Sequence, residues 1–208
     1  MILLQRGPIP PWTLPAPAGP GILVIDLTYR PGSLSSDEFV RPVEHLVQKE
    51  GAPSRVRHYT EIIPEDLSIA SGAILCGTAL ADFGYLESMK TFGWLRSFPR
   101  PVLGICAGMQ VLVRTFGGEL HPGTGIGMAD QQVVTPDPLF EGKDRFPAYE
   151  LHSLSVEPGP DFIVLATSPS GTMAVRHRDR PVYGVMFHPE VRNEWVIGRF
   201  LALCMAPQ

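Results

Sequence analysis

The sequence has few cysteines, no cluster of basic residues and no long apolar run, and each shortage excludes a class of protein. Its 208 residues include three cysteines, Cys76, Cys106 and Cys204, whose irregular spacing fits neither a disulfide framework nor a paired-cysteine metal site. The net charge of -4 arises from acidic and basic residues mixed along the chain, which argues against binding to nucleic acid or to a membrane surface. No apolar run approaches the roughly 20 residues of a membrane span, and the first residues lack the pattern of a signal peptide. We therefore expect a cytoplasmic protein with no disulfide, metal site or other cofactor.

The length and the hydrophobic content of 44% are sufficient for one substantial core. Residues 1–20 contain six prolines, which remove backbone donors and disfavour helix, so this stretch is predicted to be an irregular arm. The arm is either a docking segment or disordered. Residues 21–208 show no internal repeat and are predicted to form the functional domain.

From residue 21 to residue 116 the sequence alternates between strand-like and helix-like segments. Short apolar runs predict strands, and apolar residues at helical spacing predict helices. The predicted strands are 21–27, 54–59, 72–76 and 101–105, and the predicted helices are 37–50, 85–97 and 107–116. This alternation predicts an α/β fold with a mostly parallel central sheet and helices on both faces.

Between residues 120 and 187 the pattern changes to short strand-like pieces separated by turn residues. Pro, Gly and Asp punctuate this region. The predicted strand pieces are 132–135, 154–156, 163–166, 173–176 and 182–187. We expect a small antiparallel extension to the parallel sheet.

Cys106 has the surroundings of a catalytic nucleophile. Gly104 and Gly108 bracket it, an apolar strand precedes it and a helix follows, which is the context of a nucleophile elbow. At a helix N-terminus the unpaired backbone N–H groups favour a thiolate, and the N–H of Ala107 can donate to an oxyanion. The alternative is an ordinary buried cysteine, which is what we expect of Cys76 and Cys204.

His188 and Glu190 are the predicted partners of this cysteine. They follow a strand-like run, and Pro189 between them favours an extended backbone that projects both side chains to the same side. Glu190 can then orient the imidazole while its other nitrogen faces the thiol. The alternative is a simple turn with a solvated carboxylate.

Three segments resemble known motifs. Residues 104–110, followed by Phe116-Gly117-Gly118-Glu119, resemble the nucleophile motif of the class I glutamine amidotransferases. Residues 171–190 resemble the C-terminal motif of the anthranilate synthase and GMP synthetase branches, and residues 149–154 are similar to the Tyr-His-Ser-Leu segment of the anthranilate and aminodeoxychorismate branch. The resemblance extends from about residue 21 to residue 203 and implies the flavodoxin-like fold of that family.

The resemblance implies hydrolysis of the glutamine side-chain amide through a γ-glutamyl thioester on Cys106, with ammonia passed to a partner synthase. His188 would act as base and acid, and Glu190 would orient it. The family's contacts to glutamine and to its oxyanion fall on Gly77, Thr78, Leu80, Ala107, Gln110 and the main chain of Ser153 and Leu154.

The chain departs from the family pattern at the oxyanion loop. The family usually has a loop such as Gly-Gly-Pro-Gly, whereas this chain has Gly77-Thr78-Ala79-Leu80. Because Cβ atoms restrict positive φ angles, we expect an oxyanion hole that forms only after a loop shift, and therefore weak or partner-dependent activity. Two alternatives remain: a hydrolase of γ-glutamyl compounds, or a regulatory or scaffold member of the fold with weak catalysis.

Overall fold

The structure is a computed structural model that describes residues 21–205. The predicted arm, residues 1–20, lies outside the described residues. The strands are β1 (Ile22–Asp26), β2 (Ser54–His58), β3 (Gly72–Leu75), β4 (Val102–Ile105), β5 (Glu119–Val133), β6 (Arg145–Glu157), β7 (Phe162–Ser168), β8 (Gly171–His177) and β9 (Val182–Val185). The helices are α1 (Leu34–Phe39), α2 (Arg41–Lys49), α3 (Pro64–Ile69), α4 (Gly84–Glu87), α5 (Ala107–Thr115) and α6 (Trp195–Met205), with 3-10 helices η1 (Met89–Arg96) and η2 (Pro138–Phe140).

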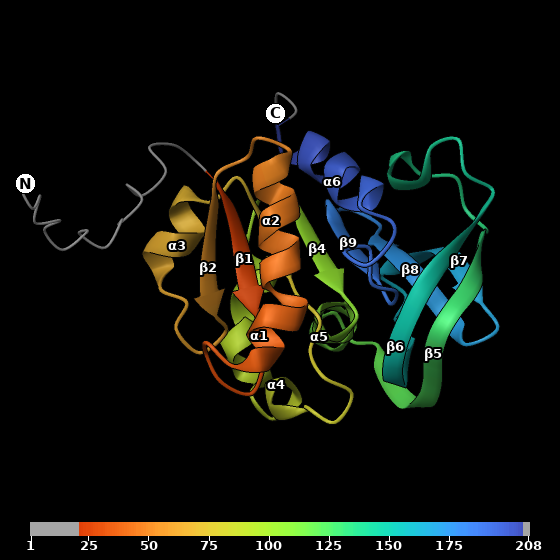
Figure 1. The fold of residues 1–208 in the computed structure, drawn as a ribbon, viewed down its shortest axis with the longest axis horizontal. Coiled ribbons are helices and arrows are strands. Elements are labelled where there is room, and N and C mark those ends of the chain that lie inside the picture. Colours follow the sequence, from red (N-terminus) through yellow and green to blue (C-terminus); the bar gives the residue numbers. More distant parts are fainter. Residues whose placement is uncertain (1–20, 206–208) are drawn as a thin grey trace, which may run out of the picture.

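Within residues 21–205, nine strands form one curled sheet in the order β2-β1-β3-β4-β9-β8-β7-β5-β6 (Figure 1). Strands β2, β1, β3, β4 and β9 pair in parallel. From β9 onward, every pairing through β8, β7, β5 and β6 is antiparallel. The predicted α/β fold is confirmed, but the prediction of a mostly parallel sheet with a small antiparallel extension is wrong, because the sheet is mixed.

The antiparallel part exceeds the expectation because β5 and β6 are long strands. They span 15 and 13 residues and pair along most of their length. Pro122 and nearby glycines interrupt the apolar pattern of β5, and such residues usually indicate turns. Here the pairing register shifts between Pro122 and Gly125, so the ribbon accommodates them with an irregularity instead of ending.

Helices cover both faces of the parallel strands. In Figure 1, α2 and α6 lie in front of the sheet and α5 lies behind it. The helix predicted at 37–50 is divided into α1 and α2, and Pro42, in the first turn of α2, has no N–H to continue the preceding helix. The helix predicted at 85–97 consists of α4 and η1. Among the helices within residues 21–205, none combines the length and apolar character that a membrane span requires.

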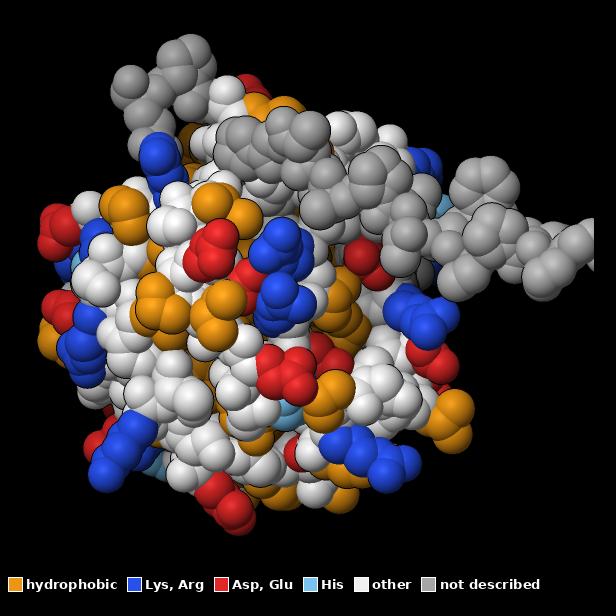
Figure 2. All heavy atoms as spheres, turned by 90° about the vertical axis from the view of Figure 1, so that its left-hand side faces the viewer, with side chains coloured by type: hydrophobic (Ala, Val, Ile, Leu, Met, Phe, Trp, Pro, Cys, Tyr) orange, Lys and Arg blue, Asp and Glu red, His pale blue; other side chains and the backbone are white. Residues whose placement is uncertain are grey.

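An ion-pair cluster fastens the outer strand β2 to α3. Asp66 of α3 is buried and accepts hydrogen bonds from Arg55 Nη1 at 2.9 Å and from Arg57 Nε at 3.0 Å. Burial alone would raise the pKa of Asp66, but the two guanidinium groups outweigh it and hold this pKa below its usual value. Figure 2, which looks at this side of the molecule, shows acidic and basic side chains interspersed among apolar and neutral polar groups.

The parallel strands carry the core and bring their carboxyl ends to one edge. Every residue of β1, β3, β4 and β9 is buried. The strands are in register, with Leu75 opposite Gly104 and Gly104 opposite Gly184. Ligand sites in α/β sheets form at this edge, and Cys106 and His188 follow β4 and β9 there.

Candidate active site

Cys106 occupies a strained turn between β4 and α5. Its backbone has φ 48° and ψ -104°, and among residues 21–205 it is the one non-glycine residue with a positive φ. Such a conformation costs about 1–3 kcal/mol and persists only where surrounding structure imposes it. The turn is therefore built to present this side chain.

The two glycines of the elbow are required by packing. A Cβ on Gly104 would lie 2.5 Å from the carbonyl group of Gly108, and a Cβ on Gly108 would lie 2.3 Å from the backbone oxygen of Leu75. The backbone N–H of Cys106 donates to Val185 O at 2.7 Å, which ties the turn to β9. The elbow thus depends on close backbone contact with both neighbouring strands.

The thiol of Cys106 is nearly enclosed. The residue is 4% exposed, and Sγ donates to the backbone oxygen of Leu151 on β6 at 3.4 Å. Ala107 is the first residue of α5, so its N–H has no acceptor within the helix and is available to an oxyanion.

His188 and Glu190 form a buried pair next to the elbow. The Nδ1 atom of His188 lies 2.7 Å from Oε1 of Glu190, and the two side chains are 1% and 2% exposed. Burial alone would lower the pKa of His188, but the adjacent Glu190 carboxylate and Cys106 raise it well above its usual value. Within the described part of the chain, Nε2 of His188 has no hydrogen-bond partner.

Contacts with β6 and with the loop after β3 fix the position of His188. Its N–H donates to Tyr149 O at 2.8 Å, so β6 holds the residue that follows β9. A Cβ on Gly77 would lie 2.7 Å from Cε1 of the imidazole, so the glycine retained in the loop after β3 makes room for His188. This steric requirement was not evident from the sequence.

The loop Gly77–Leu80 has a conformation that its residues tolerate. None of Thr78, Ala79 and Leu80 has a positive φ. Thr78 Oγ1 donates to Asp82 Oδ2 at 2.7 Å, and Ser153 Oγ donates to Leu80 O at 3.1 Å. Side-chain contacts from both directions therefore hold the loop in this form.

A narrow cleft lies between this loop, the elbow and β6. Most of the predicted contact residues line it: Thr78, Leu80, Cys106, Ala107, Gln110 and Ser153. Leu154 is joined through its backbone oxygen, which accepts from Gln110 Nε2 at 3.3 Å. The structure thus gathers residues from three separated segments of the sequence.

Tyr85 is a cleft residue that the sequence analysis missed. Its hydroxyl donates to Oε1 of Gln110. Burial, together with Cys106 and Asp82, raises the pKa of Tyr85, so the hydroxyl remains a donor. No local signal indicates this contact, because 25 positions separate the two residues in the chain.

With this geometry established, comparison with known proteins assigns the family. Residues 35–199 match the model of the family "Glutamine amidotransferase class-I". The chain belongs to the class I glutamine amidotransferases. The glutamine-hydrolyzing GMP synthase subunit of Methanothrix thermoacetophila is 37% identical over 150 residues, which cover 67% of this chain and 80% of the relative.

Other relatives agree with this assignment. The anthranilate synthase component 2 of Methanothermobacter marburgensis is 41% identical over 97 residues, 44% of this chain and 50% of that protein. The crystal structure of a provisionally assigned GMP synthase subunit from Thermoplasma acidophilum superimposes with a TM-score of 0.78 at 21% identity, covering 89% of this chain and 94% of the other. This last similarity concerns the fold alone.

The other two cysteines of this amidotransferase are buried, as expected, and do not line the cleft. Burial raises the pKa of Cys204 to about 12. Burial and nearby carboxylates, of which Glu190 contributes most, also raise the pKa of Cys76 well above its usual value. Both thiols are therefore unsuited to act as nucleophiles.

Proposed function

We propose that this amidotransferase hydrolyses the side-chain amide of glutamine with Cys106 as nucleophile, His188 as base and acid, and Glu190 as the group that orients His188. The observation that carries the proposal is the buried 2.7 Å contact between His188 and Glu190 beside the strained elbow of Cys106. A nucleophile, a base and an orienting acid are the parts that acyl transfer requires.

The first half of the reaction forms the thioester. The thiol proton, now directed at Leu151 O, moves to Nε2 of His188, and the thiolate attacks the amide carbon of glutamine. The tetrahedral intermediate collapses as the imidazolium returns its proton to the leaving nitrogen, which departs as ammonia. Glu190 stabilises the imidazolium in this step.

The second half regenerates the enzyme. His188 takes a proton from water, the resulting hydroxide attacks the thioester carbon, and glutamate leaves as the proton returns to Sγ of Cys106. The same two residues therefore serve both half-reactions, as acid–base reciprocity requires.

Contacts to the oxyanion and to the substrate complete the proposal. The backbone N–H groups of Ala107, Thr78 and Leu80 stabilise the oxyanion. Gln110 and the main chain of Ser153 and Leu154 hold the substrate. Gly77 leaves room for the imidazole of His188. Asp82 and Ser153 pin the loop in its present form. We propose that the oxyanion hole is complete only after a partner shifts this loop. Until then a backbone donor to the oxyanion is missing, and loss of one donor costs about 3 kcal/mol, roughly a hundredfold in rate.

The ammonia is proposed to pass to a synthase on another polypeptide. The support is that the relatives include an anthranilate synthase component 2 and a glutamine-hydrolyzing GMP synthase subunit, both parts of synthases. We also propose that residues 21–208 form the amidotransferase domain. A reducing, cytoplasmic location is proposed on the basis of the three free cysteines.

Glutamate release from glutamine by the whole chain tests this function, alone and with candidate synthases. Cys106→Ala should abolish release, whereas the matched variant Cys204→Ala should retain it. A glutamine-shaped alkylating agent should modify Cys106 first. Absence of turnover under all conditions would favour a scaffold role, and turnover of larger γ-glutamyl compounds in preference to glutamine would favour a γ-glutamyl hydrolase.

A further inference from the structure

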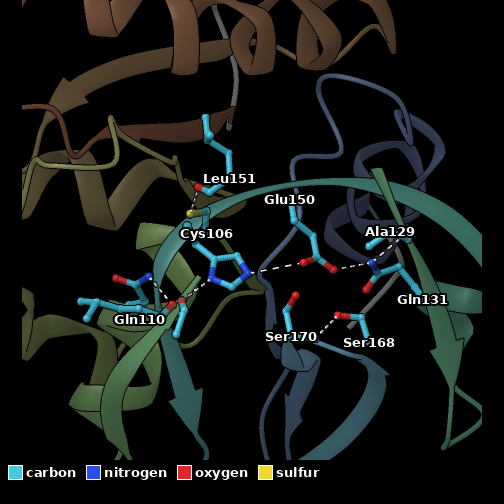
Figure 3. Close-up of polar contacts among 11 residues, drawn as sticks. Cys106, Gln110, Ala129, Gln131, Glu150, Leu151, Ser168 and Ser170 are labelled. Atoms are coloured by element: carbon cyan, nitrogen blue, oxygen red, sulfur yellow. Dashed lines mark hydrogen bonds and ion pairs between the residues drawn. The ribbon is translucent and has the colours of Figure 1, made fainter. Parts of the chain in front are cut away.

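Behind the cleft, two ionisable side chains that the mechanism does not use are buried side by side. Glu150 and His152 of β6 are 1% and 2% exposed. Figure 3 shows Glu150 on the strand that passes Cys106, with its carboxylate near Gln131, Ser168 and Ser170. Burial of a carboxylate is costly unless the charge is paired and hydrogen-bonded, so the pair requires an explanation.

The surroundings of Glu150 are arranged for a charged carboxylate. Gln131 Nε2 donates to Oε1 at 2.9 Å, and Nε2 of His152 lies 3.7 Å from Oε2. Burial alone would raise the pKa of Glu150, but His152, Gln131 and the hydroxyls of Ser170 and Ser168 lower it to about 2. The carboxylate is therefore ionised at neutral pH.

His152 is the second member of the pair and lies two positions after Glu150 on β6. Its Nδ1–H donates to Gly123 O at 3.1 Å, which turns Nε2 toward Glu150. Within residues 21–205, Nε2 of His152 has no hydrogen-bond partner, and the carboxylate of Glu150 faces it at 3.7 Å. A Cβ on Gly125 would lie 2.4 Å from both Glu150 Oε2 and His152 Nε2, so a glycine is needed where β5 covers the pair.

The backbone between and beside these side chains forms one wall of the active site. Leu151 O accepts from the thiol of Cys106, and Leu154 O accepts from Gln110. On the other side of Glu150, Tyr149 O accepts from the N–H of His188. A shift of this strand would therefore displace contacts to the nucleophile, the base and the substrate cleft together.

We infer that Glu150 and His152 are a positioning pair that fixes β6 against Cys106 and against the glutamine cleft. The inference rests on the proposed function for its link to glutamine. The pair acts through the backbone of β6 and touches neither substrate nor the reacting atoms.

The test compares Glu150→Gln with Glu157→Gln. Glu157 is a matched control because it lies on the same strand and also pairs with a histidine. Its partner is His121 of β5, at 3.0 Å, and this pair lies at the exposed surface. Glu150→Gln is expected to raise the KM for glutamine about tenfold, the equivalent of one lost buried contact, with a smaller change in kcat. Alkylation of Cys106 by iodoacetamide should become about threefold faster, because a looser β6 uncovers the thiol.

Further variants address coupling and folding. His152→Gln should resemble Glu150→Gln, and the double variant should be no worse than the poorer single variant, because the second change removes a contact that the first has already broken. Gly125→Ala, which forces the pair apart without changing either side chain, should act in the same direction and decides the matter if Glu150→Gln does not fold. Effects of Glu150→Gln equal to those of Glu157→Gln, or losses that multiply in the double variant, would overturn the inference.

The two proposals fail in distinguishable ways. If the wild-type chain does not hydrolyse glutamine, the proposed function fails, whereas the iodoacetamide rates still report whether the pair positions β6 against Cys106. If glutamine is hydrolysed and every variant of the pair matches Glu157→Gln, the positioning role fails alone.

Discussion

Replacement of Glu190 by glutamine tests the charge that supports His188. The carboxylate lies 2.7 Å from Nδ1, and both side chains are almost fully buried. Glutamine has the same size and its carbonyl oxygen can still accept from Nδ1–H, so the change removes the charge and retains the shape. A charge-assisted hydrogen bond contributes about 1.5–3 kcal/mol, so kcat for glutamine hydrolysis should fall about tenfold to a hundredfold.

The pH dependence of the unfolding free energy provides a second test of the same pair. The raised pKa of His188 means that the stability contributed by its pair with Glu190 is fully present below the unfolded-state pKa of histidine. This contribution is lost as the pH rises through the higher pKa of the folded state. The difference in unfolding free energy between the wild type and Glu190→Gln should therefore be largest in mild acid and should narrow under alkaline conditions.

A matched control is available four residues away. Glu194 is an exposed carboxylate in the same segment, and Glu194→Gln should leave kcat near the wild-type value. The assays are glutamate release at saturating glutamine, with the most active partner synthase present, and thermal unfolding across the pH range. If Glu190→Gln keeps the full wild-type rate, Glu190 does not support His188 as proposed.

Three further variants examine the elbow, the cleft and the distal ion pair. Gly108→Ala places a Cβ 2.3 Å from Leu75 O and should cost about 1–3 kcal/mol of stability, whereas Gly93→Ala, which meets nothing within 4 Å, should be neutral in the same thermal melts. Tyr85→Phe removes a buried donor to the cleft and should raise the KM for glutamine about fivefold to tenfold with kcat less affected, in a glutamine titration. Asp66→Asn should destabilise the protein by about 1–2 kcal/mol at neutral pH. Because the pKa of Asp66 is lowered in the folded state, the stability that its charge contributes is present above the unfolded-state pKa. In thermal melts at acid pH, the difference in stability between wild type and variant should vanish as the pH falls through the folded-state pKa.

Local sequence was sufficient for the parallel half of the sheet and for the elbow. Runs such as Val102–Ile105 are apolar without interruption because both faces of these strands are covered, and this pattern is legible without knowledge of the partners. The glycines around Cys106 were also interpretable, because they bracket the cysteine between a strand and a helix, although the contact of Gly108 with Leu75 on β3 was visible only in the structure. His188 and Glu190 do meet as predicted, but the prediction of an extended backbone between them is wrong, because residues 189 and 190 lie in a turn that is closed by the hydrogen bond from Val191 N–H to His188 O at 3.1 Å.

The antiparallel half was not accessible in the same way. In β5 the glycines and Pro122 suggest turns, and only pairing with β6 shows that the chain remains extended through them. The helix predicted at 37–50 is divided into α1 and α2. Pro42 could be recognised in the sequence as a cause of this division, but the packing that also determines it could not.

What the sequence by itself determined is the elbow around Cys106, the proximity of His188 to Glu190 and the α/β character of the chain, since each of these follows from a local pattern of residues. Only the tertiary structure decided how the sheet curls, why Gly77 must be small, and which groups stand behind the cleft. Tyr85 meets Gln110, and Glu150 meets Gln131, across separations that no local pattern encodes. These contacts exist because strand pairing brings distant segments within hydrogen-bonding distance, and buried polar groups then have to find partners there.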